Sequence, residues 1–254
     1  MNATIAVQSG LRAENRYFYV WMAGAFVLVA FGGFSPTYWA PVAAGTFHAP
    51  YIIHIHGMLM FVWTCYFFVQ TALVATGRTM DHRSWGLAGI SLFSVLACAI
   101  LVGEQAVLKR DDTLGYGDAA RRFAAVTLCA WPLLVTVFTL AIVNIRRPQV
   151  HKRLMVLLMT GMMTPAIARV FITLFAAGAP SGPPPPFVSL PPALVADLLL
   201  VAAMVHDWRT RGKPHSVYVI GGSVLLAQQV LTVPFAASGA WMAIAKAFQR
   251  LAGS

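Results

Sequence analysis

Seven apolar runs, each long enough to cross a bilayer as a helix, constrain this chain more than any other feature of its sequence. The hydrocarbon core of a bilayer is about 30 Å thick and takes roughly 20 apolar residues per helix. The runs cover approximately residues 17–34, 51–76, 85–107, 123–145, 154–177, 187–205 and 217–245. The sequence therefore predicts an all-α, polytopic membrane protein with seven transmembrane helices.

The composition leaves no room for a separate soluble domain. Hydrophobic residues make up 59% of the chain and charged residues 10%, whereas soluble domains are about 45–50% apolar and about 25% charged. We expect one transmembrane domain at 17–250, preceded by a short cytoplasmic tail at 1–16. The first run is longer than the roughly 7–15 apolar residues of a signal peptide, so we interpret it as the first helix.

Basic residues set the expected orientation. Lys and Arg are more numerous at the ends of the runs that an inside N-terminus would place in the cytoplasm, and such an excess marks the cytoplasmic side. We expect a cytoplasmic N-terminus and a periplasmic C-terminus. The net charge of +10 lies in these short clusters, which predicts contact with membrane lipids and no nucleic-acid partner. The three cysteines lie within apolar runs and indicate no disulfide or zinc site.

A short pattern recurs at the three predicted cytoplasmic turns, where an arginine is followed four residues later by a histidine. The pairs are Arg78 and His82, Arg147 and His151, and Arg211 and His215. The repetition predicts a first helix followed by three helical hairpins. The six side chains could simply reach the lipid headgroups. Alternatively, the three histidines converge on one inner-face site for a ligand, a haem or a lipid headgroup, kept neutral by the helix N-termini.

A second set of polar side chains lies within the apolar runs, where ionisable groups are costly and indicate function. Arg169 and Asp197 fall at one level of two consecutive helices, so we expect them to form an ion pair, with Pro165 kinking the helix beside it. The whole set predicts a polar pocket in the outer half of the bilayer. It comprises His54, His56, Glu104, Arg169, Asp197 and Gln228. The alternative is that these groups only hold helices together.

His54 and His56 are two residues apart and so point to different sides of a helix. Each has a methionine four residues later, Met58 or Met60. A His/Met face can bind copper, but methionine is also common apolar filling. The pattern assigns no metal.

Three short motifs carry a resemblance to known proteins. They are His54-Ile55-His56-Gly57, the segment RTMDHRSWG from Arg78 to Gly86, and the segment HKRLM from His151 to Met155. In these the chain resembles a widespread, uncharacterised group of bacterial multi-pass inner-membrane proteins. That resemblance extends over nearly the whole chain and implies a location in the bacterial cytoplasmic membrane.

A local similarity links His56-Gly57 and the stretch from His82 to Gly86 to the ascorbate-reducible transmembrane b-type cytochromes. It implies one haem b at the inner face, held by His82 and His151. The order and spacing of the motifs depart from that family, and no second outer axial histidine is present on another helix.

No catalytic signature of a soluble enzyme is present: there is no GxSxG, Walker loop, HExxH or dinucleotide fingerprint. Whether the protein is an enzyme stays open. The leading hypothesis is that the outer pocket binds or transports a small molecule, a lipid or a quinone. The alternatives are a membrane b-type haem or metal redox protein that uses the inner-face histidines, and a non-catalytic assembly or structural factor.

Overall fold

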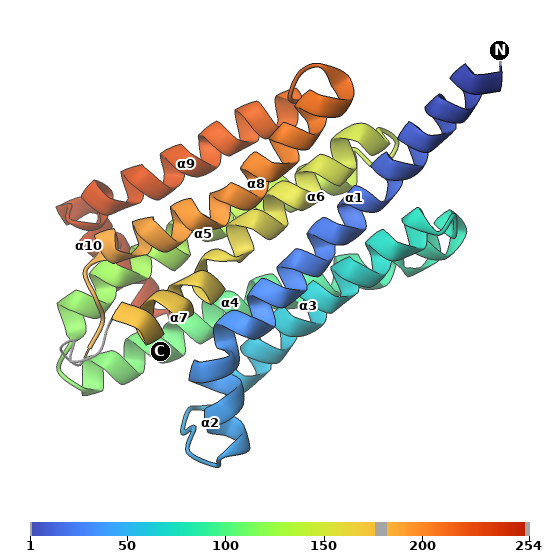
Figure 1. Ribbon diagram of the computed structural model, residues 1–254. Coiled ribbons are helices and arrows are strands. Elements are labelled where there is room, and N and C mark those ends of the chain that lie inside the picture. Colours follow the sequence, from blue (N-terminus) through green and yellow to red (C-terminus); the bar gives the residue numbers. More distant parts are fainter. Residues whose placement is uncertain (1, 176–181, 252–254) are drawn as a thin grey trace.

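In a computed structural model the apolar runs form long helices that lie side by side in one bundle (Figure 1). The structure describes residues 2–175 and 182–251, and within them it contains no strand. Seven helical segments are long and apolar enough to cross a membrane, which confirms the predicted all-α polytopic fold. The elements are α1 (Asn2–Phe34), η1 (Ser35–Trp39), α2 (Ala40–Ala43), α3 (Tyr51–Ala75), α4 (Thr79–Thr113), α5 (Gly117–Val143), α6 (Pro148–Met162), α7 (Thr164–Phe175), η2 (Pro186–Ser189), α8 (Leu190–Arg211), α9 (Ser216–Ala236) and α10 (Gly239–Arg250).

The two ends of the bundle differ in their connections. At the end that holds the N-terminus, short turns at residues 76–78, 144–147 and 212–215 join α3 to α4, α5 to α6 and α8 to α9. We call this the inner end, after the predicted orientation. The opposite, outer end holds α2, the α4–α5 turn and α10 (Figure 1).

The α6–α7 segment is the central one. Half of the residues in its most apolar stretch are buried inside the bundle, whereas 17–33% are buried in the corresponding stretches of the other six spans. It is interrupted at Met163, two residues before Pro165, as expected for a proline that removes a helical N–H. On one side α7 touches α1 so closely that a Cβ on Gly33 would lie 2.3 Å from the Ala166 carbonyl oxygen.

The predicted seventh helix was too long. It ends at Ala236, and α10 begins at Gly239 as a separate helix. Ser238 separates the two, and its hydroxyl accepts a hydrogen bond from the Trp241 N–H at 3.1 Å, which is an N-cap. Trp241 is 2% exposed and donates its indole N–H to the Arg121 carbonyl at 2.8 Å, so α10 packs against α5. Of the loop predicted at 178–186, residues 178–181 lie outside the described residues.

Candidate functional site

Two of the three repeated histidines meet at the inner end. His82 stands in the first turn of α4 and His151 in the first turn of α6. Their ring centroids are 6.3 Å apart, with the ring planes at 71°. Each Nδ1 has a hydrogen-bond partner of its own.

A chain of hydrogen bonds between α3 and α4 fixes the proton of His82. The Tyr66 hydroxyl donates its only hydrogen to the Trp85 carbonyl at 2.5 Å, so it must accept from the side-chain amide of Gln70. The oxygen of Gln70 therefore faces His82 Nδ1, 2.9 Å away. Because an amide oxygen only accepts, His82 carries its proton on Nδ1. Tyr66 approaches this place only because Gly89 has no side chain, since a Cβ there would lie 2.7 Å from its ring.

His151 is held by a simpler device. Its Nδ1 lies 2.8 Å from the carbonyl oxygen of Ala141, which belongs to the last turn of α5. Carbonyls in the last turn of a helix have no intrahelical partner, and a carbonyl only accepts. His151 thus also carries its proton on Nδ1.

In both rings Nδ1 is thus engaged as a donor, which leaves Nε2 as the nitrogen that can bind a ligand. Neither Nε2 makes a hydrogen bond within the part of the chain that the structure describes. The helices that carry the rings are not a closely packed pair, because α4 packs on α3 and α5 while α6 packs on α5, α8 and α9. A Cβ on Gly86, one turn after His82, would meet nothing within 4 Å. The site therefore combines two ligand-competent nitrogens with open space beside α4.

The third histidine does not join this pair, contrary to the expectation of one three-histidine site. His215 caps α9, and its Nδ1 accepts the N–H of Val217 at 3.2 Å. Its own backbone N–H donates to Asp207 at 3.2 Å. Burial lowers the pKa of the His215 imidazole, and the nearby positive charges of Arg153 and Arg211 lower it further.

A buried ion pair at the inner end was missed in the sequence. Arg153 of α6 and Asp207 of α8 are 2% and 1% exposed. The guanidinium makes two hydrogen bonds to the carboxylate, one of them from Nε at 2.7 Å. It also donates to the backbone and side-chain oxygens of Gln149, at 2.8 and 2.7 Å. Arg153 had been counted only as a positive charge of the α5–α6 turn, although the HKRLM motif contains it.

The predicted ion pair between Arg169 and Asp197 was wrong. None of the ion pairs among the described residues joins them. Asp197 accepts a hydrogen bond from Gln229 of α9 at 3.3 Å, so it faces α9, away from α7. The Arg169 guanidinium lies 5.7 Å from the centre of the Phe34 ring of α1. The two residues therefore contact different neighbours.

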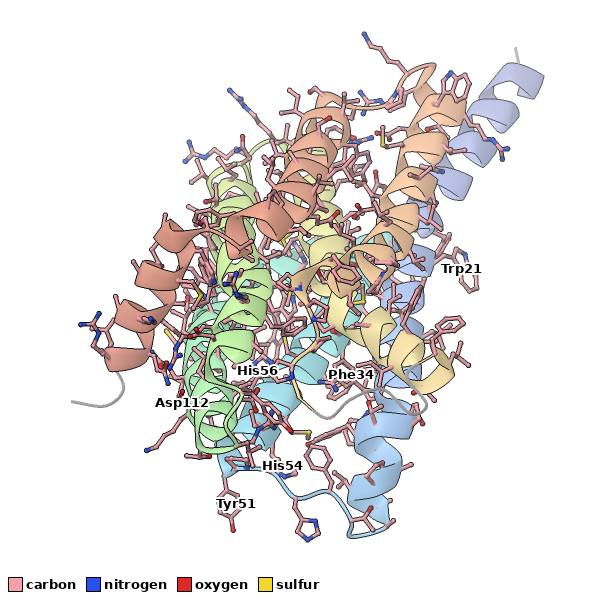
Figure 2. The ribbon with its side chains drawn as sticks, turned by 90° about the vertical axis from the view of Figure 1, so that its left-hand side faces the viewer. Trp21, Phe34, Tyr51, His54, His56 and Asp112 are labelled. Atoms are coloured by element: carbon pink, nitrogen blue, oxygen red, sulfur yellow. The ribbon has the colours of Figure 1, made fainter. Side chains whose placement is uncertain are left out.

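The rest of the predicted outer pocket is divided in the same way. Gln228 bonds only within its own helix, to Thr232 at 3.0 Å. His54 lies 3.0 Å from the Tyr38 hydroxyl. His56 packs toward Gly103 of α4, next to Glu104, and its Nδ1 is buried without a partner. Figure 2 shows His54 and His56 on the same part of the bundle as Phe34. His56 and Arg169 thus belong to the side near α1, α3 and α4, and Glu104 hydrogen-bonds with Thr127 of α5. Asp197 and Gln228 belong to the α8–α9 side.

The three arginines of the repeat each make a separate contact. Arg78 pairs with Asp81 at 2.6 Å on the surface, and Arg211 reaches the side-chain oxygen of Gln149 at 3.5 Å. Arg147 is the residue before α6, and its carbonyl accepts the N–H of His151 at 3.0 Å.

No group of three or more histidine, cysteine, aspartate or glutamate side chains occurs in the described residues at metal-binding distances. The two-histidine site therefore suits a metal that brings other ligands with it.

A comparison with known protein families found no match, and neither the curated proteins nor the solved structures gave one.

Proposed function

We propose that this integral membrane protein is a b-type haem protein in which His82 and His151 would hold the haem iron, and that it takes part in one-electron transfer. The observation that carries the proposal is the matched anchoring of two imidazoles through Nδ1, with their rings 6.3 Å apart. When bound, haem supplies a one-electron redox centre.

The ring separation is wide enough for one metal between the two imidazoles. An imidazole nitrogen binds a metal at about 2.0–2.1 Å, so two ring centroids lie about 6.4 Å apart across a metal and about 5.2 Å apart at a tetrahedral angle. The observed 6.3 Å matches the first arrangement. With no third side-chain ligand in the described chain, a porphyrin is the group that would complete the coordination.

The surrounding residues perform the tasks that such a site requires. Gln70 and the Ala141 carbonyl hold the Nδ1 protons, which leaves each Nε2 free to bind the metal and raises its basicity. Gly86 leaves space along α4. The positive charge of Arg83 acts on His82, and Arg147 precedes His151 by one turn, so two cations lie near where propionates could be bound.

The experiment is a visible absorption spectrum of the full-length protein, produced with haem precursor and purified in detergent. We expect an intense Soret band that shifts on reduction, about one haem per chain by pyridine haemochrome assay, and a low-spin electron paramagnetic resonance signal. The variants His82→Leu and His151→Gln should each lose most of the haem. Gln is used at 151 because it retains an N–H donor for the Ala141 carbonyl.

The matched control is His48→Gln, because His48 is an outer-end histidine whose ring bonds only to the Thr46 carbonyl. This variant should keep its full haem content. Gln70→Leu should retain the ligands but bind haem roughly 10–100-fold more weakly, as expected for loss of a group that orients a metal ligand. A haem-free wild-type protein, or undiminished haem in a folded His82→Leu variant, would refute the proposal.

A further inference from the structure

Among the residues that the structure describes, none offers an acidic partner to the guanidinium of Arg169. Its neighbour Phe34 lies about 13 Å below the outer end of the first span, at a helical rise of about 1.5 Å per residue. No described carboxylate lies within 4.0 Å of it. A charge at this depth is costly unless it is paired or reaches water. The ring of Phe34 supplies a cation–π contact at 5.7 Å, which stabilises a cation by only about 0.5–2 kcal/mol.

The surroundings of Arg169 add positive charge to its own. Protein atoms surround it closely enough to desolvate it, and the charge of Arg110 on α4 acts on it repulsively. Arg110 pairs with its neighbour Asp111 at 2.7 Å, so this carboxylate is already engaged. Arg169 is nevertheless exposed at the surface of the bundle. An anion can therefore reach its guanidinium.

The same side of α4 carries a second unsatisfied polar group deeper in the bundle. Gly103 and Arg110 are seven residues apart and so share a helix face, and His56 packs toward Gly103. Its Nδ1 atom is buried and has no hydrogen-bond partner. From Arg110 to Gly103 is about 10 Å along the helix axis. On the α1 side, Phe34 is half-buried and packs edge-to-face on the buried Phe61 of α3, with ring centroids 5.7 Å apart.

From this arrangement we infer that Arg169, with Arg110 beside it, binds the phosphate or carboxylate of an amphiphilic ligand that enters from the outer end. The anionic group neutralises the unpaired guanidinium, which favours bidentate binding of planar or tetrahedral oxyanions. The apolar part of the ligand lies along Phe34 and the neighbouring apolar residues of α7. This site is separate from the inner histidine pair and does not depend on haem.

The test compares the wild type with Arg169→Gln and Arg169→Lys. Thermal unfolding is measured in a neutral detergent with inorganic phosphate or decanoate, and in nanodiscs of phosphatidylglycerol or phosphatidylcholine. We expect at least a tenfold weaker response to the anionic probe in Arg169→Gln and an intermediate response in Arg169→Lys. Arg209→Gln, in the last turn of α8 at the inner end, is the matched control and should respond like the wild type.

The probe that raises the melting temperature identifies the source of the anion. A response to phosphate or decanoate in detergent supports a soluble ligand, and a response to phosphatidylglycerol alone supports a lipid headgroup. Without any anion, Arg169→Gln should be at least as stable as the wild type, because it removes an unpaired charge. The proposal is overturned if no probe separates Arg169→Gln from the wild type. It is also overturned if Arg169→Gln is destabilised equally with and without anion, since that result indicates an acidic partner within the protein.

Discussion

Replacing Asp207 by leucine should destabilise this protein far more than replacing a carboxylate of a surface ion pair. Asp207 is 1% exposed and its partner Arg153 is 2% exposed, so the mutation strands a guanidinium where water does not reach it. Breaking a buried pair in this way costs about 3–5 kcal/mol. The backbone N–H of His215 also loses its acceptor, which adds about 1 kcal/mol.

The double variant Arg153→Met/Asp207→Leu provides the decisive comparison. It removes both charges together, and replacing a whole buried pair by apolar residues is often nearly neutral. The oxygen of Gln149 and the N–H of His215 still lose a partner each, so we expect a net cost of about 1–3 kcal/mol. The double variant should therefore be more stable than either single variant.

The assay is reversible unfolding in mixed detergent micelles, followed by tryptophan fluorescence. Asp81→Leu is the matched control, because Asp81 and Arg78 form an ion pair with 45% and 65% exposed side chains. Exposed pairs contribute at most about 1 kcal/mol. The reasoning fails if Asp207→Leu costs no more than Asp81→Leu, or if the double variant loses the sum of the two single losses.

Three further outcomes can be measured by unfolding or proteolysis. The pKa of His215 is lowered in the folded protein, so the unfolded state binds the proton more readily. The free energy of unfolding should therefore fall as the pH drops through about 6.5. His215→Asn, which retains an N-cap acceptor, should weaken this pH dependence in melting curves. Ser238→Ala removes the cap of α10 and should lower the stability of the helix by about 1 kcal/mol. Trypsin should then cleave faster after Lys246 and Arg250. The control Ser91→Ala, on an exposed helix face, should leave cleavage unchanged. Gly33→Ala places a Cβ 2.3 Å from the Ala166 carbonyl oxygen and should lower the melting temperature. A Cβ on the control Gly32→Ala meets nothing within 4 Å, so that variant should be neutral or more stable by up to about 1 kcal/mol. Equal effects of the two substitutions would contradict the close α1–α7 contact.

The number and type of the helices could be predicted because they depend on local properties of the chain. A run of apolar residues satisfies its own backbone hydrogen bonds in lipid only as a helix, so run length is enough to identify a span. The break near Pro165 followed from the chemistry of one residue. The end of the seventh helix was mistaken because residues 237–245 remain apolar, and the Ser238 cap and the packing of Trp241 outweigh that signal.

The contacts between polar side chains were harder to predict. His82 and His151 were expected at the same membrane level, and their pairing was one of two interpretations of the repeat. The Gln70–Tyr66 network that orients His82 had a signal in the sequence, since Gln70 is the only carboxamide in its span and Tyr66 lies one turn before it. Arg153 and Asp207 gave no such signal, because both also fit the basic and acidic residues common at helix ends.

Sequence spacing along a helix predicts depth, since the rise per residue is constant. It does not predict the rotation of a helix about its axis when the helix is apolar on all sides, because no polar face then marks the lipid-exposed side. The predicted pairing of Arg169 and Asp197 was wrong for this reason, since Asp197 bonds to Gln229 and Arg169 lies by Phe34. The rotation is set by close contacts such as Gly33 on Ala166 and Gly89 on Tyr66, and those contacts exist only once the helices have packed together.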